Sequence, residues 1–318
     1  MPAVRPRDPS STPTGQQWVI GHGRQQVVIT EVGATLRTYT VGDRDVIDGF
    51  PESQWSQSGR GQVLAPWPNR LADGRYSFGG EDLQVPIDEP GLGNAIHGLV
   101  RWLPWRAEAH AQNVVVMTCD LHPTPGYPFG LQLRVEYRLG REGLSVTTTA
   151  INVGDRALPF GIGFHPYFTV GTGSIDTCTL QLPGRQRLVL DSRSLPTGEV
   201  RTVVGTEFDF TTVRSIGPTR MDTAFGDLLR DGNGVAWATL THPGRELEVA
   251  LWMDDQFSHL MCYTGDTLGD AARRRKGVAI EPMTCPPNAL ATGDGVIVLE
   301  PTQAWTSSWG IRPRVASI

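Results

Sequence analysis

The side chain with the strongest chemical signal in this sequence is Glu281. It follows the apolar run 277–280, which is predicted to be a buried strand, and it precedes Pro282. Burying a carboxylate costs free energy unless the group is paired or used in chemistry. Buried glutamates are also uncommon and tend to mark functional sites. Glu281 is therefore predicted to be a functional acid or base, and the alternative is a carboxylate buried in a structural pair.

Two histidines stand in settings that suit proton transfer. His97 lies within 94–102 and is followed by Gly98, which lets a ligand or other backbone approach closely. His165 lies within 159–168, where four aromatic side chains would partly desolvate the imidazole and make its proton affinity adjustable near neutral pH. Either histidine, taken alone, can also be a core residue with one satisfied hydrogen bond.

Two further polar side chains are candidates for binding a ligand. Arg70 ends the Pro-rich segment 66–70, and its fixed fork of donors suits sugar hydroxyls or carboxylates, although a salt bridge would explain it equally well. Asp222 is either a turn residue or an acceptor for neighbouring hydroxyls. Two histidines and a carboxylate also form a common iron-binding set. Such sets usually place two ligands close together on one strand, and here all three are far apart in sequence, so no metal is expected.

The composition argues against several classes of partner. The 318-residue chain carries a formal net charge of −5, which is not the basic footprint of a nucleic-acid-binding protein. Its one dense basic run, 273–276, is interpreted as a solvated loop or the end of a short helix. No apolar stretch approaches the roughly 20 residues that a membrane-spanning helix needs. Neither nucleic acid nor a membrane is an expected partner.

The N-terminus and the cysteines bear on location. Residues 1–17 are polar, rich in Pro, Ser and Thr, and lack the apolar segment of a signal peptide, so a flexible tail is predicted. The four cysteines show no CxxC pair and no nearby His-rich spacing, so neither a zinc site nor a disulfide framework is expected. Cys119 and Cys178 lie among strand-like residues and are predicted to be small core side chains. A cytoplasmic location fits these observations.

The elements that must position the candidate groups are predicted to be strands. Between Leu131 and Leu139 every odd position is apolar and every even one polar, which places the two sets on opposite faces of a strand. Residues 144–151 favour a second strand, and 140–143 suits the hairpin turn between them. The 37 Gly and 24 Pro indicate many short elements joined by turns. Further strand-like runs occur at 26–32, 114–121, 178–182, 188–190, 235–240, 247–253 and 296–299. The sequence thus predicts one all-β domain, 18–318, built as a sandwich or barrel.

Several segments, taken in order, resemble the aldose 1-epimerase (galactose mutarotase) family. The similarity runs through nearly the whole chain and is carried by 68–78, 94–101, 163–168, Met221-Asp222 with Phe225, 263–265 and 281–289. It implies a large antiparallel β-sandwich, the galactose mutarotase-like supersandwich, with an open cleft on one face. It also implies an isomerase that needs no cofactor, takes a small-molecule sugar as its partner, and exists as a monomer or homodimer.

The resemblance also implies roles for individual residues. Glu281 would be the general base and His165 the general acid. His97, counted with these catalytic residues, would bind the sugar together with Arg70, Asn69, Asp222 and Tyr167. The family often has Gln where this chain has Met261, which removes one hydroxyl contact. The segments 67–70 and 97–102 are most similar to a bacterial branch that includes suspected sulfoquinovose mutarotases, which leaves the choice of sugar open.

Mutarotation suits this set because every step is a proton transfer. A base takes the proton of the C1 hydroxyl while an acid protonates the ring oxygen; the ring opens, C1 rotates, and closure on the other face gives the second anomer. With unperturbed pKa values of about 4.3 and 6.5, an ionised Glu281 and a protonated His165 would be matched near neutral pH. The alternatives are a sugar-binding or sugar-sensing protein without turnover, a hexose 6-phosphate epimerase with Arg101 as its one candidate cation, and a metal-dependent oxygenase.

Overall fold

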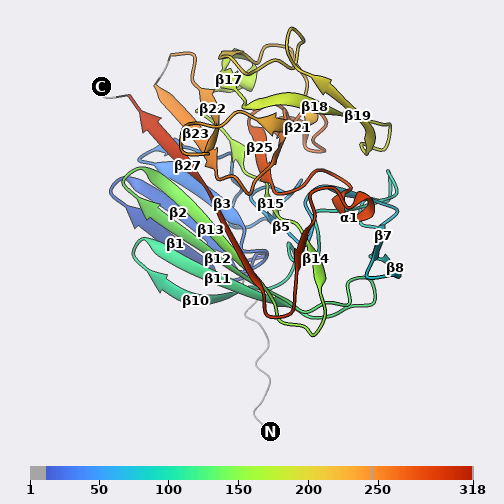
Figure 1. Cartoon of the computed structure of the whole chain (residues 1–318). Coiled ribbons are helices and arrows are strands. Elements are labelled where there is room, and N and C mark those ends of the chain that lie inside the picture. The colour runs from blue at the N-terminus through green and yellow to red at the C-terminus, as the bar shows by residue number, and fades with distance from the viewer. Residues whose placement is uncertain (1–11, 245, 317–318) are drawn as a thin grey trace.

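Antiparallel strands dominate the computed structural model, which describes residues 12–244 and 246–316 (Figure 1). The largest sheet has nine strands in the order β10-β11-β12-β13-β27-β23-β22-β17-β20. These are Arg106–Ala111, Val114–Leu121, Leu131–Gly140, Gly143–Asn152, Ala304–Val315, Leu247–Met253, Ala236–Thr241, Thr179–Gln181 and Arg214–Ser215, in that order. The C-terminal strand β27, red in Figure 1, pairs with β13 on one side and β23 on the other. It thereby joins the strands of the first half of the chain to those of the second.

A second large sheet, of eight strands, has the order β19-β18-β21-β24-β25-β15-β5, with β16 also paired to β25. Its strands are Pro196–Thr202, Gly184–Leu190, Asp222–Leu228, His259–Tyr263, Val278–Met283, Gly163–Phe164 and Val63–Leu64, with β16 at Tyr167–Phe168. This sheet carries Glu281 near its middle, on β25. Of the other predicted site residues, Tyr167 lies on β16, which pairs with β25, and Asp222 lies on β21, which is separated from β25 by β24.

Smaller elements complete the fold. A four-stranded sheet is formed by β1 (Gln17–His22), β2 (Gln25–Thr30), β3 (Leu36–Val41) and β4 (Arg44–Asp45). Three two-stranded sheets pair β6 (Arg70–Ala72) with β9 (Asn94–Ile96), β7 (Arg75–Phe78) with β8 (Glu81–Gln84), and β14 (Leu158–Phe160) with β26 (Ile297–Leu299). The helical elements are short: α1 (Ala289–Thr292), η1 (Ile175–Thr177) and η2 (Ala271–Arg273).

The predicted all-β architecture is confirmed, and β12 shows its physical basis. The odd-numbered apolar side chains from Leu131 to Leu139 are buried, while the even-numbered ones between them are more exposed. The hairpin follows as predicted, with Gly140 paired to Gly143 across the turn into β13. The buried Tyr137 donates a hydrogen bond from its hydroxyl to the carbonyl of Ala34 at 2.7 Å, so its polar atom is satisfied inside the core.

The domain boundaries stay a prediction, which the double pairing of β27 favours. Of the predicted tail, 1–17, residues 1–11 lie outside the described residues. The remainder is bound to the four-stranded sheet: the Gln16 amide donates to the Glu31 carboxylate at 2.8 Å, and Gln17 begins β1. All four cysteines are described, buried and free. Among the described residues, no helix is long and apolar enough to cross a membrane.

The basic run 273–276 differs in part from its interpretation as a solvated segment. It begins at the end of η2, as expected, but two of its guanidinium groups are largely buried in ion pairs. Arg273 reaches Asp48 at 2.6 Å, and Arg275 reaches Asp176 at 2.6 Å and Asp266 at 2.9 Å. The ion pairs with Asp48 and Asp176 therefore hold the segment 264–277 against other parts of the fold, because fixed carboxylates are available there as partners.

Candidate active site

Three adjacent strands of the eight-stranded sheet bring carboxylates and a phenol to one face. Across these strands Asp222 pairs with Tyr263, and Met261 pairs with Glu281. Paired residues share a face of a sheet, and so do residues two positions apart on one strand. Asp222, Tyr263 and Glu281 therefore project to the same side, although they lie far apart along the chain.

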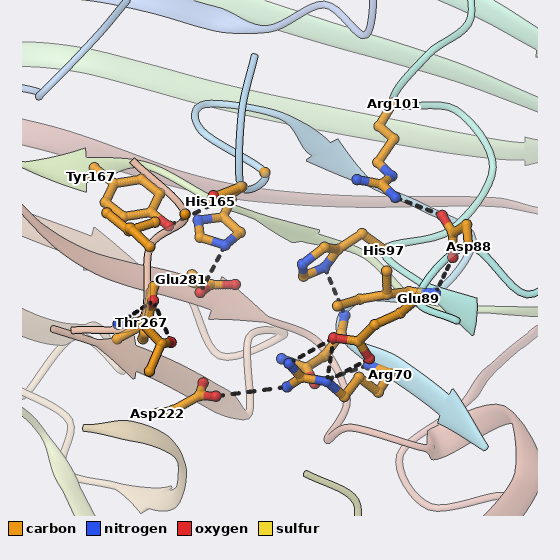
Figure 2. Close-up of a pocket in the computed structure, with 17 residues that line it drawn as sticks. Arg70, Asp88, Glu89, His97, Arg101, His165, Tyr167, Asp222, Thr267 and Glu281 are labelled. Carbon is orange, nitrogen blue, oxygen red and sulfur yellow. Dashed lines mark hydrogen bonds and ion pairs between the residues drawn. The ribbon is translucent and has the colours of Figure 1, made fainter. Parts of the chain in front are cut away.

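That side of the sheet forms the floor of a cavity of about 320 Å³ (Figure 2). This volume lies at the lower end of the range of roughly 300–1,000 Å³ that is typical of small-molecule sites. The cavity is lined by all seven residues that the sequence predicted for the site: Asn69, Arg70, His97, His165, Tyr167, Asp222 and Glu281. The close convergence of these residues is the central prediction of the sequence, and the structure shows it.

Glu281 and His165 are the closest pair of potential acid and base. The Nε2 atom of His165 lies 3.3 Å from Oε1 of Glu281, as the dashed line in Figure 2 marks. Both side chains are nearly enclosed, with 5% of His165 and 2% of Glu281 exposed. Within the described part of the chain, His165 Nδ1 and Glu281 Oε2 have no hydrogen-bond partner. Such unsatisfied buried atoms cost stability and are available to a ligand.

Burial moves the two pKa values in opposite directions. The pKa of His165 falls to about 3 because burial penalises the imidazolium and the positive charge of Arg60 adds to that penalty. The pKa of Glu281 rises well above its ordinary value because of burial and then the negative charge of Asp222, with Arg70 opposing the shift. These two directions favour the proton of the pair on Glu281. The ionised glutamate and protonated histidine expected from unperturbed pKa values are not what this environment favours.

His97, which directly follows β9, is held in one tautomer by Asn69, which directly precedes β6. The Asn69 amide N–H donates to His97 Nδ1 at 3.2 Å, and the His97 amide N–H donates back to the Asn69 carbonyl at 2.9 Å. Burial, and then the positive charges nearby, hold the pKa of His97 well below 6.5, so the ring is neutral. A neutral ring that accepts at Nδ1 carries its proton on Nε2. His97 is thus prepared to donate a hydrogen bond from Nε2.

The backbone at this pair is unusual and explains the local sequence. Asn69 and His97 both have positive φ angles, of 58° and 64°. Asparagine and histidine adopt this conformation more often than most residues, but it is uncommon and is held by the surrounding structure. Gly98, also at positive φ, packs against the backbone of Ala65 so closely that no Cβ would fit. The segment from Asn94 to Gly98 thus positions the His97 imidazole in a turn whose backbone angles few other residues could adopt.

Arg70 is fixed by a carboxylate that the sequence did not reveal. Its guanidinium donates to both oxygens of Glu89, with distances of 2.9 to 3.2 Å, and its Nη1 lies 3.8 Å from Asp222. Glu89 also accepts from the amide of Asn94 at 3.0 Å. Beside it, Asp88 pairs with Arg101 at 2.5 Å. The adjacent acids 88–89 precede the His97 segment, but nothing in their sequence distinguishes them from surface carboxylates.

Tyr167 and Asn69 line the cavity, yet part of their bonding capacity is already used. The Tyr167 hydroxyl donates to the Ser58 carbonyl at 3.2 Å, and its ring stacks on His165 at a centroid distance of 5.0 Å. Asn69 Oδ1 accepts from the Arg70 amide at 2.9 Å. Tyr167 therefore packs on His165 and Asn69 is bonded to the next residue of its chain, while sugar contacts by both stay a prediction.

Met261 lies beside Glu281 rather than at a polar contact. It is buried and clusters with Ala224 and Met283, the apolar side chains that surround the carboxylate on the sheet. This apolar setting contributes to the burial that raises the pKa of Glu281. No group of three His, Cys, Asp or Glu side chains among the described residues is arranged to hold a metal ion.

Fold and site together define an all-β protein with an enclosed carboxylate–imidazole pair in a sugar-sized cleft. A family model described as aldose 1-epimerase matches residues 16–312. The chain belongs to this aldose 1-epimerase family, and it is a mutarotase, an isomerase.

Individual relatives support the same placement. The chain is 36% identical over 289 residues to YihR, an uncharacterized protein of Escherichia coli K12, covering 90% of each protein. It is 25% identical to a maltose epimerase of Levilactobacillus brevis, covering 87% of this chain and 88% of the relative. A crystal structure of a GalM/aldose epimerase homologue from C. elegans superposes with a TM-score of 0.84 at 17% identity, covering 95% of this chain and 99% of that one. That structural likeness shows the shared fold.

Because the Glu281 carboxylate is buried, we expect it to lower the stability of the folded protein at high pH. The folded pKa of Glu281 is raised, so between about pH 4.3 and that raised value the folded state binds more protons than the unfolded state. Its contribution to stability is therefore present at low pH and is lost as the pH rises. Glu281→Gln, which is neutral at all pH values, should raise the melting temperature relative to wild type at pH 8 and much less at pH 4.

Thermal unfolding followed by circular dichroism at both pH values measures this effect. Glu248→Gln is the matched control, because Glu248 sits on β23 in a partly exposed ion pair with Arg314. That change should have the same small effect at both pH values. A Glu281→Gln protein that is less stable than wild type at pH 8 would contradict the assignment of an unpaired buried carboxylate.

Proposed function

We propose that Glu281 and His165 interconvert the α and β anomers of a free aldose by exchanging protons with it. The observation that supports this proposal is their 3.3 Å contact inside the cavity. When a cyclic sugar opens, one member of the pair takes the proton of the C1 hydroxyl and the other protonates the ring oxygen. Closure on the opposite face of the aldehyde reverses both transfers. Each positioned acid or base typically contributes ~10²–10⁴-fold to the rate.

The pair needs one proton in total, and the open and closed sugars place it differently. With Glu281 as base and His165 as acid, the ring-closed state has carboxylate and imidazolium. After opening, the proton sits on Glu281 and the imidazole is neutral. The pKa directions favour this second distribution. The buried site thus favours the proton distribution of the open-chain intermediate. In the ring-closed state, hydrogen bonds from the bound sugar stabilise the carboxylate and the imidazolium.

Three further side chains are proposed to hold the sugar. His97 donates from Nε2, because Nδ1 already accepts from Asn69. Arg70 is oriented by Glu89 and presents its remaining N–H groups to hydroxyls. Asp222, 43% of whose side chain is exposed, accepts from hydroxyls at the mouth of the cavity. A rigid donor–acceptor frame of this kind positions the anomeric carbon against the proton-transfer pair.

The charges around the cavity favour an uncharged sugar. Its lining contains the carboxylates of Asp88, Glu89, Asp222 and Glu281 but only two arginines, Arg70 and Arg101. Both arginines are paired with carboxylates. A phosphate group would meet no cluster of free cations here, so a hexose 6-phosphate is not favoured. The four free, buried thiols suit work in the cytoplasm, where thiols stay reduced.

One observation favours a second candidate, a sugar with a singly charged substituent such as sulfoquinovose. Arg101 lines the cavity, and its Nε is buried with no partner among the described residues. Only one of its terminal nitrogens is engaged by Asp88. A sulfonate could use the unsatisfied edge of the guanidinium without needing the larger cationic cluster of a phosphate site.

Removing either member of the proton-transfer pair should abolish most of the activity. Glu281→Gln and His165→Asn should each lower kcat at least about a hundredfold, because each removes one proton carrier. Polarimetry or exchange NMR on glucose and galactose, corrected for spontaneous mutarotation, measures the rate. Glu248→Gln should keep the wild-type rate. A folded variant of the pair with near-wild-type kcat would refute the proposed mechanism.

A panel of sugars separates the two substrate candidates. Glucose, galactose, xylose, arabinose and maltose should be turned over with higher kcat/KM than glucose 6-phosphate or sulfoquinovose, because carboxylates outnumber arginines in the cavity. Asp88→Asn frees Arg101 and should improve the anionic sugars relative to glucose. If wild type instead prefers sulfoquinovose, and Arg101→Gln removes that preference alone, the second candidate replaces the first.

A further inference from the structure

A guanidinium outside the cavity lining is packed against the catalytic pair through one aromatic ring. The central carbon of the Arg60 guanidinium lies 3.9 Å from the centroid of the Tyr167 ring. The same ring stacks on the imidazole of His165, with centroids 5.0 Å apart and planes inclined by only 12°. A cation over an aromatic face is attracted to its π-electrons and fixes the ring beneath it. Arg60, Tyr167 and His165 thus form a continuous packed series that ends at the reacting nitrogen.

Arg60 is itself rigidly held. Only 3% of it is exposed, and its Nη1 donates to both the carbonyl and the carboxylate of Asp48 at 2.7 Å. The other carboxylate oxygen of Asp48 pairs with Arg273 at 2.6 Å. A buried cation is costly unless it is paired in this way. The charge of Arg60 is therefore fixed in place, and the basic run 273–276 helps to fix it.

The residues on either side of Arg60 also contact His165. The Gly61 amide donates to the His165 carbonyl at 2.8 Å. A Cβ at Gly59 would lie 2.5 Å from Cδ2 of the His165 ring, so the glycine allows the ring to pack against that backbone. Both the side chain and the backbone of segment 59–61 therefore act on the orientation of one imidazole.

We propose that Arg60 is a positioning residue for the reaction, acting on His165 through the ring of Tyr167. This inference rests on the proposed role of His165 in proton transfer. Arg60 makes no contact with the sugar-binding face, since it is not among the residues that line the cavity. Its function is to keep the imidazole oriented toward Glu281 and to keep it uncharged when no sugar is bound.

Several other groups also act on the His165 ring, and the test must separate them from Arg60. Glu281 faces it from β25, Tyr167 stacks on it from β16, and His97 packs edge-on at a centroid distance of 5.3 Å. The positive charges of Arg101 and Arg70 add to that of Arg60 in lowering the pKa of His165. A variant that changes Arg60 alone leaves all these groups in place.

Arg60→Met removes the cation but keeps an apolar side chain on the Tyr167 ring. Asp48 retains its bond to Arg273, so the variant should fold. We expect the acid limb of the kcat/KM profile to move up by about one pH unit, toward the value of an ordinary histidine. We also expect kcat to fall about tenfold with KM nearly unchanged, because the imidazole is less well oriented. Arg60→Lys keeps the charge without the planar stack, so it should restore part of the wild-type acid limb and part of the wild-type kcat.

The matched control is Arg273→Gln, which removes the other cation on Asp48 but leaves the stack untouched. It should leave the acid limb in place. NMR titration of the His165 ring from pH 3 to pH 8 reads the same shift directly in each variant. If Arg60→Met leaves both the ring titration and the acid limb unchanged while His165→Asn is inactive, the role of Arg60 is refuted and the proposed mechanism stands. If His165→Asn is active, the proposed mechanism itself fails.

Discussion

The burial of one carboxylate against one imidazole is the constraint on which the rest of this structure depends. Glu281 sits on β25 in a sheet whose neighbouring strands supply apolar side chains, and its Oε1 lies 3.3 Å from Nε2 of His165. In water such a pair would titrate as two ordinary groups. In this setting burial moves both pKa values toward the uncharged forms, so that the single proton of the pair is favoured on Glu281. The proposed proton exchange with a sugar depends on this arrangement.

A buried carboxylate without a fixed counter-charge lowers stability, and the fold is arranged to tolerate it. The nine-stranded sheet, through strands such as β12 with its alternating buried side chains, supplies apolar burial far from the cleft. The eight-stranded sheet is thereby free to carry polar side chains on one face. Arg70, the nearest cation on the cavity wall, is bonded to Glu89 rather than to Glu281. The arginine is thus available for the proposed orientation of hydroxyls without directly neutralising Glu281, the proposed proton carrier.

The extent to which the sequence predicts this molecule follows from the range of the interactions involved. Strand β12 is predictable because alternation with a period of two is a local property, and β11 and β23 have the predicted bounds for the same reason. The convergence of the seven predicted residues on one cavity is predictable because the segments around them are distinctive in residue type and order. Glu89 and Arg60 are not, because each matters through one partner, Arg70 or Tyr167, that only the fold brings near. The protonation state of His165 also escapes prediction, since burial and surrounding charge set it.

The two arginines that line the cavity are both paired with carboxylates. Arg70 with Glu89, and Arg101 with Asp88, present oriented donors and acceptors at the cavity wall. A free cation close to Glu281 would pull its pKa down and fix the proton on one side of the pair. A free anion close to His165 would act in the same direction, because it would raise the pKa of the imidazole and draw the proton away from Glu281. Pairing Arg70 with Glu89 and Arg101 with Asp88 therefore leaves burial as the largest cause of both pKa shifts, and those shifts favour the proton on Glu281.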